Sequence, residues 1–174
     1  MEINDIVKAI MSRRSIRSFL NLSVKKSQLE QIIKAGMAAP SARNMQPWSF
    51  IVVTDRAMLD KLGNKLPYAK MLLEATAAII VCGVPDKAGD SPAGYWVQDC
   101  SAATQNILLA IEALGLGAVW TGVYPREDRI AIVREVLEIP EGIFPLNVIP
   151  LGYPKGEHQP KDKFKPENIH WEKW

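Results

Sequence analysis

The feature that most constrains the fold is an almost wholly apolar run over residues 77–84, with Gly83 near its end and Pro85 directly after it. A short run of this kind indicates a strand in the middle of a sheet, buried on both of its faces. Helices on both sides of the sheet are the natural cover for those faces, so we expect three layers. The run is far too short to span a bilayer, and we expect no membrane segment.

The remaining segments mix helices and strands without a regular alternation. The spacing of apolar residues predicts helices over residues 3–11, 27–36, 55–66, 96–114 and 127–137. Aromatic and β-branched composition predicts further strands over residues 48–54, 117–124 and 146–151. Two helices precede the first strand, which disfavours a strictly alternating, doubly wound parallel fold.

Individual residues refine these boundaries. Residues 27–30 (Ser-Gln-Leu-Glu) form a capping box that starts the second helix, and Asp55 is expected to cap the third. Gly115 is placed to end the long helix in a left-handed conformation. Because Pro150 cannot donate a ladder hydrogen bond, we expect the last strand at a sheet edge or a chain crossing. Residues 86–94 are rich in Gly, Pro and Asp and are expected to form a loop.

Composition and charge describe an ordinary globular protein. The chain has 174 residues, 48% of them hydrophobic and 23% charged, which favours a single domain over residues 1–174 and excludes a disordered chain. The net charge of +2 gives no general affinity for polyanions, so a bound anion needs a local cluster of cations.

Cysteine usage and the start of the sequence bear on the compartment. Cys82 and Cys100 lie far apart in apolar segments, without a CxxC pattern, so they form neither a zinc site nor a disulfide framework. We expect two buried free thiols and no metal site. The acidic first residues lack the pattern of a signal peptide, and we expect a cytoplasmic location.

The first candidate site is residues 13–19 (Arg-Arg-Ser-Ile-Arg-Ser-Phe), directly after a predicted helix. Guanidinium groups at Arg13, Arg14 and Arg17, with serine hydroxyls beside them, suit a phosphate group because arginine binds phosphate oxygens through two parallel hydrogen bonds. The alternative interpretation is a solvated basic helix end that complements the helix dipole.

The second candidate is the loop over residues 40–48 (Pro-Ser-Ala-Arg-Asn-Met-Gln-Pro-Trp). Ser, Arg, Asn and Gln side chains can donate and accept hydrogen bonds at the carbonyl groups and ring nitrogens of a heterocycle. Loops that carry several such groups between rigid elements are common binding sites. The alternative interpretation is a solvated connection.

The third candidate is residues 115–122 (Gly-Leu-Gly-Ala-Val-Trp-Thr-Gly). Its glycines resemble a dinucleotide fingerprint, but Trp120 stands where the last glycine belongs, and the stretch precedes a strand instead of following one. We therefore reject a Rossmann site. What remains is a glycine-rich turn at which backbone amides can approach a flat ligand closely.

No pattern in the sequence indicates a protein nucleophile. The two histidines, His158 and His170, both lie near the end of the sequence, and GxSxG, HExxH and P-loop patterns do not occur. An enzyme without such groups usually takes its reactivity from a cofactor.

Together these stretches resemble the nitroreductase family of FMN-dependent oxidoreductases. The matching segments, in order, are residues 13–19, 40–48, 115–122, and an ending that runs from Leu-Gly-Tyr-Pro at 151–154 to His-Trp-Glu-Lys-Trp at 170–174. The resemblance spans the whole chain. It implies an α+β fold, a three-layer α-β-α sandwich whose central mixed, mostly antiparallel sheet is flanked by helices.

The resemblance also implies roles for individual residues. Those expected at the FMN phosphate and ribityl chain are Arg13, Arg14, Arg17 and, nearby or at the ring edge, Ser15. Those expected to contact the flavin ring from the other subunit are Ser41, Asn44 and Gln46, in the loop that Pro40 opens. Those expected to lie by flavin N5 and O4, through their backbone, are Trp120, Thr121 and Gly122. A tail lysine, Lys161 or Lys163, would complete the phosphate site where many relatives have arginine.

The activity implied by the resemblance is the reduction of nitroaromatics, quinones or related small acceptors by NAD(P)H. Hydride passes through flavin N5 in a ping-pong sequence, without a catalytic side chain, in a homodimer with FMN at the subunit interface. Neither nucleic acid nor membrane is an expected partner. Two alternatives stay open: a flavin-binding or flavin-processing protein without turnover, and a cofactor-free module that uses its arginines on nucleic acid.

Overall fold

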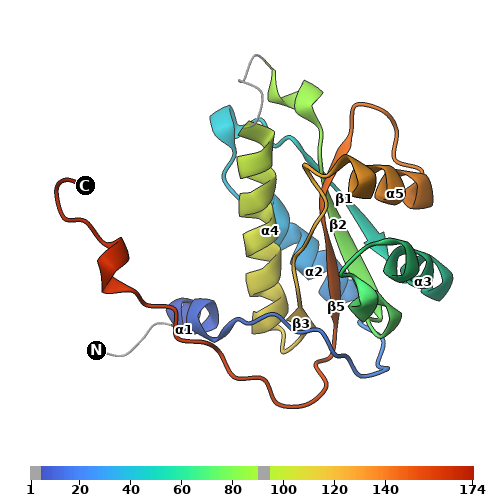
Figure 1. Ribbon diagram of the computed structural model, residues 1–174, viewed down its shortest axis with the longest axis horizontal. Helices are drawn as coiled ribbons and strands as arrows, with labels where there is room; N and C mark the ends of the chain where they lie inside the picture. The colour runs from blue at the N-terminus through green and yellow to red at the C-terminus, as the bar shows by residue number, and fades with distance from the viewer. Residues whose placement is uncertain (1–4, 90–94) are drawn as a thin grey trace.

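The computed structural model describes residues 5–89 and 95–174 (Figure 1). The α-helices are α1 (Asp5–Ser12), α2 (Lys26–Met37), α3 (Arg56–Lys65), α4 (Tyr95–Ala113) and α5 (Glu127–Leu137). The strands are β1 (Trp48–Val53), β2 (Ala77–Gly83), β3 (Gly117–Ala118), β4 (Thr121–Gly122) and β5 (Phe144–Gly152). Short 3₁₀ turns are η1 (Ala42–Asn44), η2 (Lys70–Leu73), η3 (Pro85–Ala88) and η4 (Pro166–Asn168).

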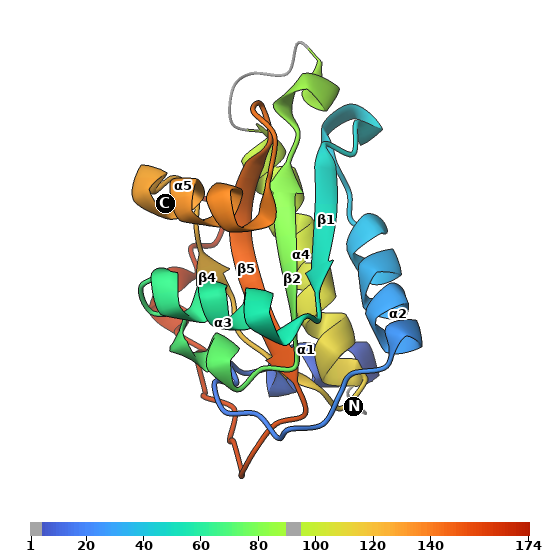
Figure 2. The same cartoon turned by 90° about the vertical axis from the view of Figure 1, so that its right-hand side faces the viewer.

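A five-stranded sheet divides the helices into two layers. Helices α2 and α4 lie on one face of the sheet, and α3 and α5 lie on the other (Figure 2). The strand order is β1-β2-β5-β3, with β4 also paired to β5, and all these pairs are antiparallel. A parallel bridge joins Ser15 to Ala118 at the β3 edge. The expected three-layer α+β fold with a mixed, mostly antiparallel sheet is confirmed.

Strand β2 is buried over its whole length, as its composition predicts. Side chains of alternate residues point to opposite faces of a strand. Ile79 and Val81 therefore pack in the core beneath α2 and α4, whereas Ile80 and Cys82 pack in the core beneath α3 and α5. Burial on both faces explains why the strand carries no polar side chain.

Of the two positions expected for β5 from Pro150, a sheet edge or a chain crossing, the sheet edge is wrong. Strand β5 is an interior strand, with β2 on one side and both β3 and β4 on the other. The carbonyl of Pro150 accepts a hydrogen bond of 3.3 Å from the N–H of Val119, in the break between β3 and β4. The nitrogen of Pro150 faces the same break, so its missing N–H removes no bond from a continuous ladder.

Two other boundaries also differ from the sequence prediction. Helix α2 begins at Lys26 with Lys25 as its N-cap, and Gln28 Oε1 accepts a hydrogen bond of 3.0 Å from the Lys25 N–H, so a capping box starting at Ser27 is wrong. The strand predicted over residues 117–124 is divided into β3 and β4. Residues 3–4 of the first predicted helix and 90–94 of the predicted loop lie outside the described residues.

Two caps are confirmed. The Asp55 carboxylate accepts a hydrogen bond of 2.9 Å from the N–H of Met58 at the start of α3. Gly115, just after α4, has a φ of 71°. This left-handed conformation favours glycine and ends the helix.

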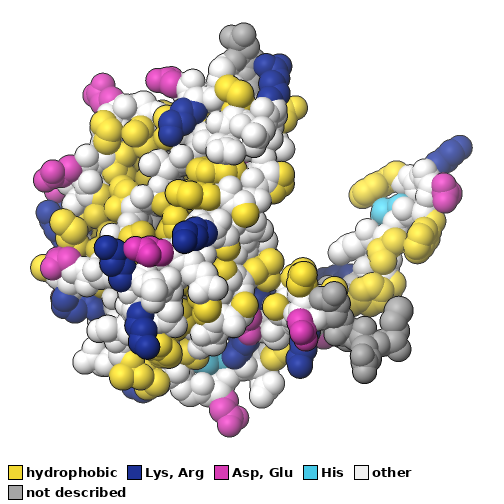
Figure 3. All heavy atoms as spheres, turned by 180° about the vertical axis from the view of Figure 1, so that it is seen from behind, with side chains coloured by type: hydrophobic (Ala, Val, Ile, Leu, Met, Phe, Trp, Pro, Cys, Tyr) yellow, Lys and Arg dark blue, Asp and Glu magenta, His cyan; other side chains and the backbone are white. Residues whose placement is uncertain are grey.

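Two apolar segments are not covered by the rest of the chain. Helix α1 buries none of its residues, and Ile10 and Met11 are 48% and 64% exposed. The second segment is the tail, residues 154–174, which extends away from the rest of the protein (Figures 1 and 3). It carries exposed Phe164, Trp171 and Trp174. Among the described residues, no helix is long and apolar enough to cross a membrane.

Candidate active site

Residues 13–19, the first motif, run alongside strand β3. The N–H of Ile16 donates a hydrogen bond of 2.9 Å to the carbonyl of Ala118. The Ile16 side chain is buried directly over Gly117, where an added Cβ would lie 2.8 Å from three Ile16 carbon atoms. Glycine at 117 therefore lets the first motif approach the third, and these two motifs adjoin in the fold.

Arg14 forms an ion pair within the protein. Its Nη1 lies 2.6 Å from Glu112 Oε1 near the end of α4, and it also donates to the carbonyl of Ser12 at 3.3 Å. The Glu112 side chain is only 14% exposed, so the pair is shielded from water more than a surface ion pair is. Arg14 thus ties the first motif to α4.

Arg13 and Arg17 form no ion pair with the residues that the structure describes. Among the described residues, neither guanidinium has a hydrogen-bond or ion-pair partner, and the Nε of Arg13 is buried without an acceptor. A buried donor without an acceptor is costly unless a ligand or water supplies one. Arg17 and Ser15 are exposed beside it. The first motif therefore presents two free cations next to β3.

The second motif, residues 40–48, is a strained loop. Arg43, Asn44 and Gln46 have φ values of 52°, 56° and 50°, a left-handed conformation that is unfavourable for residues other than glycine. Two local hydrogen bonds hold the loop: Ser41 Oγ accepts from the Gln46 N–H at 2.9 Å, and Asn44 Oδ1 accepts from Gln46 Nε2 at 3.0 Å. Strain of this kind concentrates at functional sites, where surrounding structure enforces it.

A buried carboxylate anchors this loop to α4. Asp99 is 7% exposed, and its Oδ1 accepts a hydrogen bond of 3.0 Å from the N–H of Ala42, the first residue of η1. Its other oxygen, Oδ2, is buried without a partner among the described residues. Asp99 was not predicted from the sequence, although a charged residue on the apolar face of the long predicted helix was the signal that could have identified it.

The third motif contributes backbone and little free side-chain chemistry. The Thr121 hydroxyl donates to the Val148 carbonyl at 2.5 Å, and the Gly122 carbonyl accepts from Arg129 Nη1 at 2.9 Å. Trp120 is 37% exposed between the two short strands. Arg129, on α5, was not predicted from the sequence to contact the third motif, because no motif surrounds it there.

The first and second motifs lie at opposite parts of α4. Asp99 holds the second motif and Glu112 holds the first, and they are thirteen positions apart on this helix. At 1.5 Å per residue, the two anchors are about 20 Å apart along the helix axis. One chain therefore brings the first and third motifs together but leaves the second apart from the first.

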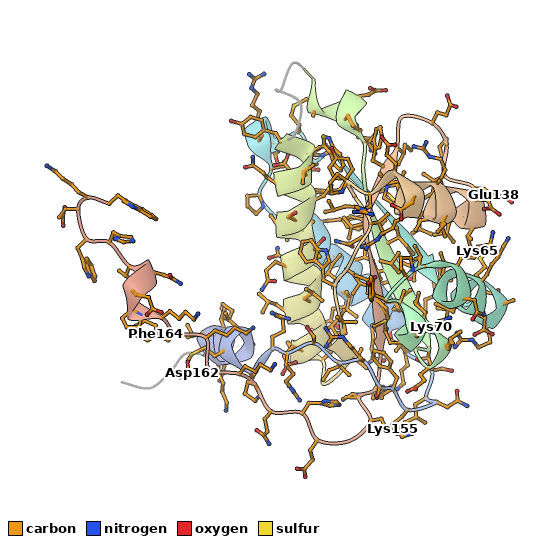
Figure 4. All side chains as sticks on the ribbon, viewed as in Figure 1. Lys65, Lys70, Glu138, Lys155, Asp162 and Phe164 are labelled. Carbon is orange, nitrogen blue, oxygen red and sulfur yellow. The ribbon has the colours of Figure 1, made fainter. Side chains whose placement is uncertain are left out.

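The tail lysines lie in the segment that leaves the body. Figure 4 labels Lys155 at the base of this segment and Asp162 and Phe164 further along it. Lys161 and Lys163 are exposed, and among the described residues no hydrogen bond or ion pair joins them to the first motif. The labelled residues Asp162 and Phe164, next to these lysines in the sequence, lie beside α1, the helix that Arg13 follows (Figure 4).

The two thiols are buried and inert. Burial raises the pKa of Cys82 and of Cys100 to about 12, and both are free cysteines, as the sequence predicts. Histidine offers no alternative base in the body of the protein, because the exposed His158 ring lies 2.9 Å from the Lys155 carbonyl in the tail. Among the described residues, no group of side chains could hold a metal ion.

Comparison with known proteins places this fold and these motifs in one family. The model of the nitroreductase family matches residues 10–66 and 64–153. A relative from Archaeoglobus fulgidus, named "Putative NADH dehydrogenase/NAD(P)H nitroreductase", is 50% identical over 175 residues, 99% of this chain and 100% of its own length. The chain therefore belongs to the nitroreductase family, and the resemblance stated from its motifs is confirmed.

Solved structures agree with this assignment. A crystal structure of a protein with the same name from Parabacteroides distasonis has a TM-score of 0.94 and 49% identity, covering 99% of this chain and 100% of that one. A crystal structure from Desulfovibrio desulfuricans in complex with FMN has a TM-score of 0.85 and 28% identity, covering 99% of both chains.

The raised thiol pKa values predict that neither cysteine reacts with an alkylating reagent in the folded protein. At pH 8 only about one buried thiol in ten thousand would be ionised, and the thiolate is the form that iodoacetamide attacks. We expect no alkylation of Cys82 or Cys100 in the folded protein and full alkylation in urea, measured by mass spectrometry. Rapid labelling of either cysteine in the folded protein would contradict this reasoning.

Proposed function

We propose that this protein is an FMN-dependent oxidoreductase that uses NAD(P)H to reduce nitroaromatics, quinones or related small acceptors in a ping-pong sequence. The observation that carries the proposal is the pair of uncommitted arginines, Arg13 and Arg17, beside the glycine-rich backbone of β3 and β4. Relatives named for NAD(P)H-dependent nitroreductase activity and a similar structure that holds FMN support it.

The residues present fit the phosphate group of FMN. The buried Nε of Arg13 has no acceptor, as is also true of the Nε of Arg14, and an anion beside the first motif would supply one. Arg17 and the hydroxyl of Ser15 are exposed next to it and can bind further phosphate oxygens. Because Arg14 already pairs with Glu112, we assign it to holding this motif in place, and the phosphate contact to Arg13 and Arg17.

Other residues would orient the flavin ring. Ser41, Asn44 and Gln46 lie in the strained loop that Asp99 anchors. The backbone of residues 120–122 follows directly after β3, the strand along which the first motif runs. FMN, when bound, supplies the hydride chemistry. The protein residues then bind and orient the ring and leave one of its faces open. No side chain of the described body is placed as a general acid, so we expect protons for the acceptor to come from solvent or the reduced flavin.

A second copy of the chain would complete the site. Following the resemblance, we assign the ring-binding loop of each site to the partner subunit. Within one chain this loop is anchored about 20 Å along α4 from the first motif. The uncovered apolar side chains of α1 and of the tail supply surface for such a contact. Strand β1 is an edge of the sheet, and a groove of about 690 Å³ lined by Leu29, Ile33, Met37 and Val52 runs beside it.

We assign the partner's tail to this groove. An edge strand has free backbone groups that can pair with an extended segment, and the apolar groove can receive alternate side chains of that segment. Residues 169–174 carry Ile169, Trp171 and Trp174, and these side chains are exposed in a single chain. In the proposed homodimer this contact joins the two chains, and FMN lies between the first motif of one chain and the second motif of its partner.

The phosphate assignment makes a prediction about affinity. Arg17→Ala removes a charge-assisted contact and should weaken FMN binding by about 2–4 kcal/mol, whereas Lys163→Ala should cost about 1 kcal/mol, because a flexible tail lysine gives a point charge without a fork. The dissociation constant of FMN, measured by quenching of its fluorescence, compares the two variants. The reverse order would make the tail the principal phosphate-binding element.

The use of one open face by both substrates makes a prediction about kinetics. NAD(P)H has to bind, give up its hydride and leave as NAD(P)⁺ before the acceptor enters. Double-reciprocal plots should therefore be parallel when both substrate concentrations are varied. Replacing His158 or His170 by Ala should change turnover by less than a few-fold, since positioned acid–base groups typically contribute about 10²–10⁴-fold. Intersecting lines, or a hundredfold loss in either histidine variant, would contradict the proposed mechanism.

A further inference from the structure

The arginines of this chain divide into two groups by their contacts. Five of the eight contact protein oxygen atoms, and these are Arg14 with Glu112, Arg56 with Asp60, Arg126 with Asp128, Arg129 with the Gly122 carbonyl and Arg134 with the Ile143 carbonyl. Among the described residues, the other three have no hydrogen-bond or ion-pair partner. Two of them, Arg13 and Arg17, are assigned above to the FMN phosphate. The third is Arg43, in the second motif.

The loop holds Arg43 in a conformation that needs support from its surroundings. Its φ of 52° is left-handed, and its neighbour Asn44 has a φ of 56°. The buried Asp99 carboxylate fixes the preceding N–H of Ala42, and Ser41 Oγ closes the loop by accepting from the N–H of Gln46. An exposed arginine that is held in this way, without an acceptor among the residues that the structure describes, has its guanidinium available to a ligand.

We infer that Arg43 determines specificity by binding a carboxylate on the electron acceptor. The inference rests on the proposed function, in which Ser41 and Asn44 contact the flavin ring. Arg43 stands between these two residues in the sequence, so its exposed side chain starts from the same short loop that would contact the ring. A planar guanidinium binds a carboxylate through two parallel hydrogen bonds, which lysine cannot do.

The position of Arg43 favours the acceptor over two other anions. The FMN phosphate is assigned to Arg13 and Arg17, and the second motif would approach the ring end of the same cofactor. The 2′-phosphate of NADPH lies a whole dinucleotide away from the nicotinamide ring that exchanges hydride. A carboxylate on a small acceptor seated on the ring is the anion within reach of Arg43.

The test compares two acceptors of the same shape. With NADH in excess, kcat/KM is measured for para-nitrobenzoate and for the uncharged para-nitrobenzyl alcohol, in the wild-type holoenzyme and in Arg43→Gln. We expect Arg43→Gln to lower kcat/KM for para-nitrobenzoate by about tenfold to a hundredfold and to leave the alcohol within about twofold. Arg43→Lys should recover part of the loss, because it restores the charge without the fork.

Two further measurements separate this inference from the proposed function. Calorimetry of benzoate binding to the oxidised holoenzyme requires no turnover, and Arg43→Gln should weaken that binding by a similar factor. The matched control is Lys61→Gln, which removes an exposed cation from α3 on the opposite face of the sheet. It should leave kcat/KM unchanged for both acceptors. FMN content and turnover of the alcohol report on the proposed function alone.

Several outcomes would overturn the inference. An equal loss with both acceptors would mean that Arg43 only supports the loop. A change confined to the preference between NADPH and NADH would mean that it binds the donor. An unchanged ratio between the two acceptors in Arg43→Gln would mean that Arg43 has no part in selecting them.

Discussion

The contact between Ile16 and Gly117 is the constraint on which the candidate site depends. A Cβ at position 117 would lie 2.8 Å from three atoms of Ile16, so only glycine lets residues 13–19 lie against β3. The hydrogen bond from the Ile16 N–H to the Ala118 carbonyl fixes the register of this contact. Arg13, Ser15 and Arg17 are thereby placed next to the backbone that the flavin ring would approach. Cations for a phosphate and amides for a ring thus come from two segments far apart in the sequence.

Helix α4 holds the first and second motifs far apart within one chain. Its two carboxylates, Asp99 and Glu112, anchor the second and first motifs about 20 Å apart along the helix. The same chain leaves the apolar side chains of α1 and the tail uncovered, which a stable monomer of this size rarely does. In the proposed homodimer, a second copy supplies the second motif to the site and covers these exposed side chains.

The sequence predicted what depends on local pattern and missed what depends on tertiary partners. The buried strand β2, the cap at Asp55 and the left-handed Gly115 follow from composition and conformational preference. The interior position of β5 could not be predicted, because Pro150 is accommodated by a break in a neighbouring strand. Likewise, three arginines in residues 13–17 look equivalent in the sequence, and only the fold shows that Arg14 pairs with Glu112, ninety-eight positions away.

Mixing two defective variants tests the shared site most directly. One variant carries Arg13→Ala and Arg17→Ala, and the other carries Asn44→Ala and Gln46→Ala, so that each alone binds FMN weakly at both sites. If each site combines the first motif of one chain with the second motif of its partner, random exchange of subunits restores about a quarter of the wild-type FMN content. FMN release and light scattering on the mixture measure this recovery. No recovery in mixed dimers of confirmed composition would contradict a site shared between two chains.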